Sequence, residues 1–148
     1  MSKPRSQRLD VVRTLAERKR REAERFLADA RQRVSQGEQG IMQLQRYLGE
    51  YQQQFTASGR EGLSIAELHT QQAFMQKINH TLQQQEQALK QAREQLQQVQ
   101  AYWQQAYARE KGIERLIAKA RQAESHERER KLQQEIDERS QHVRPRYI

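Results

Sequence analysis

The sequence lacks cysteine, and its only two prolines, Pro4 and Pro145, lie near its ends. Without cysteine the chain has neither disulfides nor thiolate metal sites. Because proline interrupts helices, about 140 residues between the two prolines can form continuous helix. No apolar run approaches the roughly 20 residues of a membrane-spanning helix, and the first residues have no apolar signal-peptide core. We therefore expect a chain that stays in the cytoplasm.

Apolar residues are also scarce: they make up 34% of the 148 residues, against 31% charged residues. The mean hydropathy is −1.19. A globular domain has roughly 45–50% apolar residues, so this chain cannot fill a round core. A long, narrow helical seam needs far less apolar material. Glutamine, glutamate, arginine, alanine and leucine dominate, which favours helix. The fold class that we predict is all-α, a long two-stranded antiparallel coiled-coil hairpin.

Apolar residues recur at spacings of three and four in both halves of the chain, which is the heptad pattern of a coiled coil. In our interpretation the first seam begins Leu9, Val12, Ala16, Lys19, Ala23, Phe26, Ala30 and Val34, and it continues to Phe55. Two successive four-residue steps around Val34 form a stutter, which locally relaxes a left-handed supercoil. The second seam runs from Ile65 to Ile113.

The break between the seams contains Gly59 and Gly62, which give a loop its conformational freedom. Ser64, followed three residues later by Glu67, forms a capping-box pattern at the start of the next helix. We predict one helical hairpin over 1–148, with a helix over about 7–56, a loop over about 57–63, a second and longer helix over about 64–141, and flexible ends.

Folding the chain at residue 61 pairs residues whose numbers add to about 122, so that Leu9 meets Ile113. Tyr47 then lies opposite Phe74, slightly beside the seam. Residues beyond about 116 have no partner on the first helix. The alternative, a parallel homodimer, would stack Lys19 on its own copy, so we expect a monomer.

The formal net charge of the chain is +8, and the excess positive charge lies at its two ends. Residues 1–33 hold 11 Lys or Arg and 5 Asp or Glu, residues 34–108 hold 5 and 6, and residues 109–148 hold 11 and 8. The hairpin brings both ends together, so its open end is basic. Such an end suits an acidic cavity, an anionic lipid surface or nucleic acid.

Catalytic and cofactor motifs are missing from the sequence. There is no phosphate-binding glycine loop and no HExxH pattern. The four histidines are far apart, and the carboxylates lie mostly beside cations. We therefore expect no enzyme activity, no metal site and no cofactor.

Three segments, in order, resemble the flagellar FliJ family: RLDVVRTLAERKRREAERFLADAR, LQRYLGEYQQQF with Tyr47 and Tyr51, and HTQQAFMQKINHTL with Phe74. The resemblance covers essentially the whole chain. It implies a non-catalytic stalk of the flagellar type III protein export apparatus, promoting flagellum assembly. It also implies peripheral association with the inner face of the cell membrane at the flagellar base.

The resemblance further implies three partners: the hexameric export ATPase FliI, the export gate protein FlhA, and flagellar export chaperones. The positions that match the family's gate-contacting surface are Leu44, Tyr47, Tyr51, Phe74 and Ile78. At its edges Thr81 and Gln85 replace family alanine and histidine, and Gly40 replaces glutamine. From the charge of the open end we assign ATPase-ring binding to Arg13, Arg20 and Arg21.

Two other functions stay open at this point. One is the equivalent stalk of a virulence type III secretion system, which predicts the same hairpin. The other is a basic coiled coil that binds nucleic acid. The sequence has no recognised nucleic-acid reader motif, and its aromatic residues lie near the seams rather than among the cations, so we expect no nucleic-acid partner.

Overall fold

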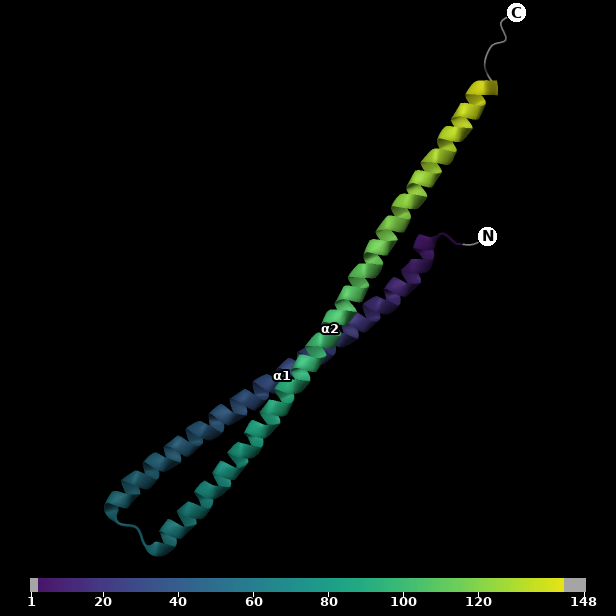
Figure 1. The fold of residues 1–148 in the computed structure, drawn as a ribbon. Helices are drawn as coiled ribbons and strands as arrows, with labels where there is room; N and C mark the ends of the chain where they lie inside the picture. The colour runs from purple at the N-terminus through teal and green to yellow at the C-terminus, as the bar shows by residue number, and fades with distance from the viewer. Residues whose placement is uncertain (1–2, 143–148) are drawn as a thin grey trace, which may run out of the picture. The chain divides into compact units, whose positions relative to one another are not determined.

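The computed structural model describes residues 3–142, which form two helices joined by a short loop (Figure 1). Helix α1 spans Arg5–Glu61 and helix α2 spans Ile65–His142. The helices pack against each other in antiparallel directions, and the described residues contain no strand. The predicted all-α hairpin with a longer second helix is confirmed. Residues 1–2 and 143–148, which belong to the predicted flexible ends, lie outside the described residues.

The loop is shorter than the sequence predicts, because α1 continues to Glu61 rather than ending near residue 56. The helix passes through Gly59, which costs about 1 kcal/mol relative to alanine but does not end it. It ends instead at Gly62, whose φ of +89° lies in the left-handed region that favours glycine. Helix α1 also begins at Arg5, slightly earlier than predicted, directly after Pro4.

The start of α2 follows the predicted capping pattern. The backbone N–H of Glu67 donates a hydrogen bond of 3.2 Å to the hydroxyl of Ser64. The N–H of Leu68 donates one of 3.1 Å to the carbonyl of the same serine. Ser64 is therefore the N-cap that the sequence indicates, and it fixes where α2 begins.

The chain divides into two compact units. The terminal unit comprises Met1–Glu22 and Gln104–Ile148, and the bend unit comprises Ala23–Trp103. Each unit contains a segment of α1 paired with a segment of α2. That the chain is a single domain stays a prediction.

The seam of α1 differs from the predicted one in its first half. Phe26 is 46% exposed and Lys19 is also exposed, whereas Leu27 is buried and Arg20 is half-buried. The side chains turned inward are Leu9, Arg13, Ala16, Arg20, Ala23, Leu27, Ala30 and Val34. Their spacing alternates between four and three without interruption. The predicted stutter is therefore wrong: the predicted seam placed Val12, Lys19 and Phe26 inward where the structure has the next residues, Arg13, Arg20 and Leu27.

The pairing register in the terminal unit also differs from the prediction. The apolar cluster there joins Ala16 to Ile113 and Ile117, with Leu9 packed against it. The residue numbers of Ala16 and Ile113 add to 129, about one heptad above the predicted 122. Part of the shift follows from the longer α1, which moves the midpoint of the bend from residue 61 to residue 63.

The paired part of α2 consequently extends beyond residue 116, where the predicted overhang begins. Ile117 is buried, and Glu124 is half-buried against the start of α1. From His126 to His142 every residue is exposed. We call residues 126–142 the overhang.

The bend unit holds its helices together with larger side chains. Leu27, Ile78 and Leu89 are buried there, together with Ala23 and Ala30. Leu89 packs against Gly37, where a Cβ atom would lie 3.2 Å from its Cδ1 atom. The missing side chain of Gly37 therefore admits Leu89 to the seam.

Candidate interaction surfaces

Three aromatic rings meet in the bend unit, two from α1 and one from α2. The ring centroids of Tyr47 and Phe74 are 6.4 Å apart with an edge-on interplanar angle of 71°. Those of Tyr51 and Phe74 are 4.6 Å apart and tilted by 53°. The predicted meeting of Tyr47 with Phe74 is confirmed. Such ring pairs contribute roughly 0.5–1.5 kcal/mol beyond the burial of their area.

The five residues assigned to the export gate differ in their accessibility. Tyr47 is 51% exposed, whereas Ile78 is only 7% exposed. Leu44, Tyr51 and Phe74 are half-buried. Tyr47 is therefore the most accessible of the five, whereas Ile78 is closed to solvent. We call Tyr47, Tyr51 and Phe74 the aromatic patch.

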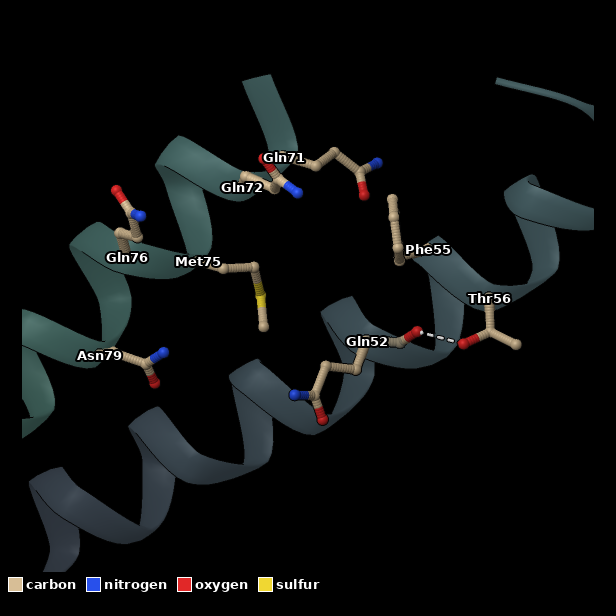
Figure 2. A pocket seen from close by; sticks show the side chains of 8 residues that line it. All are labelled: Gln52, Phe55, Thr56, Gln71, Gln72, Met75, Gln76 and Asn79. Carbon is tan, nitrogen blue, oxygen red and sulfur yellow. Dashed lines mark hydrogen bonds between the residues drawn. The ribbon is translucent and has the colours of Figure 1, made fainter. Parts of the chain in front are cut away.

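A groove of about 750 Å³ lies between α1 and α2 near the loop, also in the bend unit (Figure 2). In Figure 2 Met75 extends from α2 into the space beside α1, and Phe55 and Gln71 border it. The other lining residues are Gln52, Thr56, Gln72, Gln76 and Asn79. Gln71 has a buried amide oxygen without a hydrogen-bond partner among the described residues. No charged side chain lines this groove.

The groove begins beside the aromatic patch, since Phe55 and Gln71 lie one turn from Tyr51 and Phe74, but Gln52 and Asn79 lie on other sides of the helices from Tyr47 and Phe74. Gln52 follows Tyr47 by five residues and Asn79 follows Phe74 by five, a rotation of about 140° on each helix. Sequence reasoning missed the groove because glutamine and asparagine carry no seam signal. The glutamine and asparagine residues on both sides of the loop are the sequence feature that could have predicted a polar groove.

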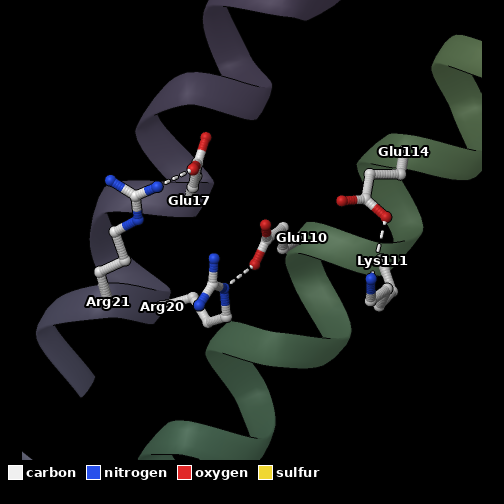
Figure 3. Close-up of polar contacts among 6 residues, drawn as sticks. All are labelled: Glu17, Arg20, Arg21, Glu110, Lys111 and Glu114. Carbon is white, nitrogen blue, oxygen red and sulfur yellow. Dashed lines mark hydrogen bonds and ion pairs between the residues drawn. The ribbon is translucent and has the colours of Figure 1, made fainter. Parts of the chain in front are cut away.

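Several polar contacts cross between the helices in the terminal unit, and Figure 3 shows one of them, between Arg20 and Glu110. The Arg20 guanidinium donates a hydrogen bond to the Glu110 carboxylate, and both side chains are largely buried, at 20% and 8% exposure. Arg20 is thus a seam residue with a partner on α2. Taking away one member of such a largely buried pair removes the contact between the two helices and costs stability.

The three arginines assigned to the ATPase ring therefore differ in their surroundings. Arg13 is a half-buried seam position. Arg21 is exposed and forms an ion pair of 2.6 Å with Glu17 one turn earlier (Figure 3). Of the three, only Arg21 is exposed, while Arg20 connects the two helices. The uninterrupted four–three spacing of the seam would have identified Arg13 and Arg20 as inward positions.

The N-terminus of α1 is capped by a residue of α2. The Ser6 backbone N–H and hydroxyl donate hydrogen bonds of 3.0 and 2.7 Å to the two carboxylate oxygens of Glu124. These bonds hold the pKa of Glu124 below its ordinary value. The hydroxyl makes the larger contribution and the backbone N–H the smaller one. The first turn of α1 contains no acidic residue, so Glu124 supplies the negative charge that its dipole favours.

A second ion pair crosses between the helices nearby, joining Asp10 to Arg121 at 3.6 Å. The numbers of Ser6 and Glu124 add to 130, as do those of Arg20 and Glu110, and Asp10 and Arg121 add to 131. These polar contacts share one register. The predicted register would have placed Glu110 opposite Val12, with no cation to meet it.

Neither a metal centre nor a membrane-spanning helix emerges from residues 3–142. No group of three or more His, Asp or Glu side chains gathers there to hold a metal ion. None of the helices described is long and apolar enough to cross a bilayer.

Comparison with known proteins gives one match. A family model described as the flagellar FliJ protein matches residues 5–144. Searches of curated proteins and of solved structures return no match.

Proposed function

The chain belongs to the flagellar FliJ protein family, and on that basis we propose that it is a non-catalytic stalk of the flagellar type III export apparatus. The match over residues 5–144 carries this proposal. The antiparallel helical hairpin supports it. The flagellar description of the family favours this function over the equivalent stalk of a virulence system.

In this proposal the chain inserts into the hexameric export ATPase FliI, contacts the export gate protein FlhA and binds export chaperones. It works in the cytoplasm, at the inner face of the membrane where a flagellum forms. The test is complementation of a non-motile strain that lacks its own stalk protein. Restored motility and export are expected, and a stably folded chain that restores neither contradicts the proposal.

The aromatic patch is the proposed contact for the gate. It combines an exposed tyrosine with two half-buried rings, and aromatic residues concentrate binding energy at protein interfaces. Leu44 and Ile78 support these rings from the seam. Truncating a central aromatic residue at an interface typically costs about 2 kcal/mol or more, which is a loss of about 30-fold in affinity.

The experiment compares two double variants of the bend unit. Tyr47→Ala with Phe74→Ala removes two rings of the patch, and gate binding and motility should fall sharply. Gln52→Ala with Asn79→Ala changes exposed residues on the groove side of the same turns, and gate binding should persist. Thermal unfolding of both variants separates lost contact from lost folding. If the first pair folds and still binds the gate, the patch is not the contact.

Contact with the ATPase ring is assigned to the terminal unit because residues 5–22 carry seven Lys or Arg and three Asp or Glu. Reversing Arg13, Arg20 and Arg21 together would also break the pair with Glu110. We therefore separate two variants. Arg21→Glu should weaken ring binding and stimulation of ATP hydrolysis, and the difference from the unchanged chain should shrink at high salt, where exposed charges are screened. Arg20→Gln should lower stability first.

The matched control for Arg21→Glu is Arg93→Glu in the bend unit, which reverses an exposed arginine that also has a carboxylate partner. This variant has the same net charge. Equal loss of ring binding in both variants would mean that net charge alone, and not the terminal unit, determines binding.

A further inference from the structure

One side of α1 in the terminal unit carries both cations and aliphatic residues. Arg5, Arg8, Val12, Leu15 and Lys19 follow one another at spacings of three and four, so they share one side of the helix. All five are exposed. Val12 and Leu15 leave aliphatic surface in solvent between cations that lie one turn before and one turn after them.

Helix α2 continues this surface. A groove of about 340 Å³ is lined by Arg5 of α1 and by residues of α2, which are Leu116, Lys119, Ala120, Ala123 and Glu124. Leu116 and Lys119 are exposed as well. The two helices therefore present one surface, which we call the basic–apolar face: Arg5, Arg8, Val12, Leu15 and Lys19 from α1, with Leu116 and Lys119 from α2.

Another side of the same unit has cations with carboxylate partners (Figure 3). Arg21 pairs with Glu17, Lys111 with Glu114 at 3.2 Å, and Arg121 with Asp10. Glu17 lies two residues from Lys19, a rotation of about 200° around α1. We call this the paired face. Its three cations and three carboxylates balance.

The cations of the basic–apolar face differ from those of the paired face in having no carboxylate partner among the described residues. Within residues 3–142, Arg5, Arg8, Lys19 and Lys119 have no ion-pair partner. Four positive charges therefore border three exposed aliphatic side chains. This combination fits a surface that offers dense negative charge with apolar material directly beneath it.

We propose that the basic–apolar face binds the surface of an anionic lipid bilayer. Lysine and arginine near such a surface each raise the partition coefficient by about fivefold, and aliphatic side chains reach the boundary of the acyl chains. Nucleic acid fits less well, because single strands are held by aromatic stacking and the face has no aromatic residue. The proposal requires neither the ATPase nor the gate, so it stands or falls independently of the proposed function.

The overhang offers a matched comparison. Leu132 and Ile136 are 57% and 50% exposed, similar to the 53% of Leu15. They lie four residues apart on one side of α2. Residues 126–142, however, hold four Lys or Arg and five Asp or Glu. This segment has equal aliphatic exposure without the positive charge.

The experiment measures co-sedimentation of the full chain with phosphatidylcholine vesicles that contain 30% phosphatidylglycerol, at about 0.15 M salt. Binding is expected to these vesicles and not to pure phosphatidylcholine. Lys19→Gln with Lys119→Gln should lower the partition coefficient by about 25-fold. Lys111→Gln with Arg121→Gln removes the same net charge from the paired face and should change it by less than about threefold, because this face is turned away from the bilayer and exposed charges are screened within about 8 Å.

The aliphatic contribution has its own pair of variants. Leu15→Ser with Leu116→Ser should weaken vesicle binding, whereas Leu132→Ser with Ile136→Ser should leave it unchanged. Circular dichroism confirms that each variant remains helical. The proposal is overturned if the chain does not bind anionic vesicles, or if both charge-pair variants lose binding equally. It is also overturned if poly-glutamate displaces the chain from the vesicles while neither serine pair affects binding. That result would identify a site for an acidic polypeptide.

Discussion

The terminal unit and the bend unit pair the same two helices by different means. In the terminal unit the apolar cluster is small, and three polar contacts cross between the helices: Arg20–Glu110, Ser6–Glu124 and Asp10–Arg121. In the bend unit leucine, isoleucine and aromatic side chains fill the seam. Its cross-helix ion pair, Arg93–Glu38 at 3.2 Å, is at least half exposed on both sides.

This difference separates two contributions to pairing: how strongly the helices pack, and which turns of the two helices face each other. Apolar side chains at heptad spacing pack acceptably after a shift of seven residues, because the same pattern recurs. A buried carboxylate opposite the wrong residue loses its partner and costs free energy. The bend unit therefore supplies packing, and the terminal unit selects which heptads face each other.

Glu110→Ala should break the terminal unit more than any other single change. It removes the buried carboxylate that Arg20 contacts across the helices, which we expect to cost about 3 kcal/mol of unfolding free energy. Glu38→Ala in the bend unit removes an exposed pair and should cost less than about 1 kcal/mol. Urea unfolding followed by circular dichroism measures both. Similar costs would abolish the distinction between the units.

A cross-link reports the register itself. Cysteines at Ser6 and Glu124 should form a disulfide readily, because these side chains are hydrogen-bonded to each other. Cysteines at Ser6 and Leu116, which the register of 122 would bring together, should not. Adding Glu110→Ala to either pair tests whether the buried carboxylate selects the register, since the first cross-link should then weaken and the second should appear.

Leu89→Ala should have the next largest effect, now in the bend unit. The side chain is buried, and its loss should cost about 2–3 kcal/mol, through lost apolar transfer and a residual cavity. The Ser6–Glu124 cross-link should persist in this variant, because the polar contacts of the terminal unit are intact. A cross-link lost together with Leu89 would show that packing also sets register.

Substitutions of helical glycines should give smaller changes of either sign. Gly49→Ala and Gly112→Ala, one in each unit, place a Cβ in open space and should each stabilise the chain by about 0.5–1 kcal/mol. Gly37→Ala places its Cβ 3.2 Å from Leu89, so it should gain less or destabilise. Thermal melts at one concentration decide the order. A gain at Gly37 equal to that at Gly49 would mean that Leu89 does not depend on the glycine.

Acid should loosen the terminal unit through Glu124, the mildest effect. The pKa of Glu124 is lower in the fold than in the unfolded chain, because Ser6 hydrogen-bonds to its charged form. Its stabilising contribution is therefore present above the ordinary carboxyl pKa and disappears as pH falls through the lowered folded pKa. The protection of the Ser6 amide, that is, how far its exchange is slowed relative to the unfolded chain at the same pH, should therefore decrease over that range. Glu124→Gln should remove this dependence, and an unchanged pH profile would contradict it.

Much of the fold follows from particular residues in the sequence. The absence of internal proline and the three–four spacing of apolar residues predict two long helices. Ser64 with Glu67 predicts where the second begins. The expected meeting of Tyr47 with Phe74 is correct as well, because the Phe74 ring lies against two tyrosines one turn apart on α1, and a small error in register leaves it near both.

Contacts between the helices decided the rest. Arg13 and Arg20 look like solvent residues in a sequence, and Phe26 looks like a core residue, because hydropathy ranks side chains without their neighbours. The contacts with α2 explain both features. Arg20 is in the seam because Glu110 binds it there, and Glu124 caps the first turn of α1. A heptad pattern determines that two helices pair, but it repeats every seven residues and so does not specify which turns meet. That choice rests on buried polar groups, whose free energy depends on one particular partner.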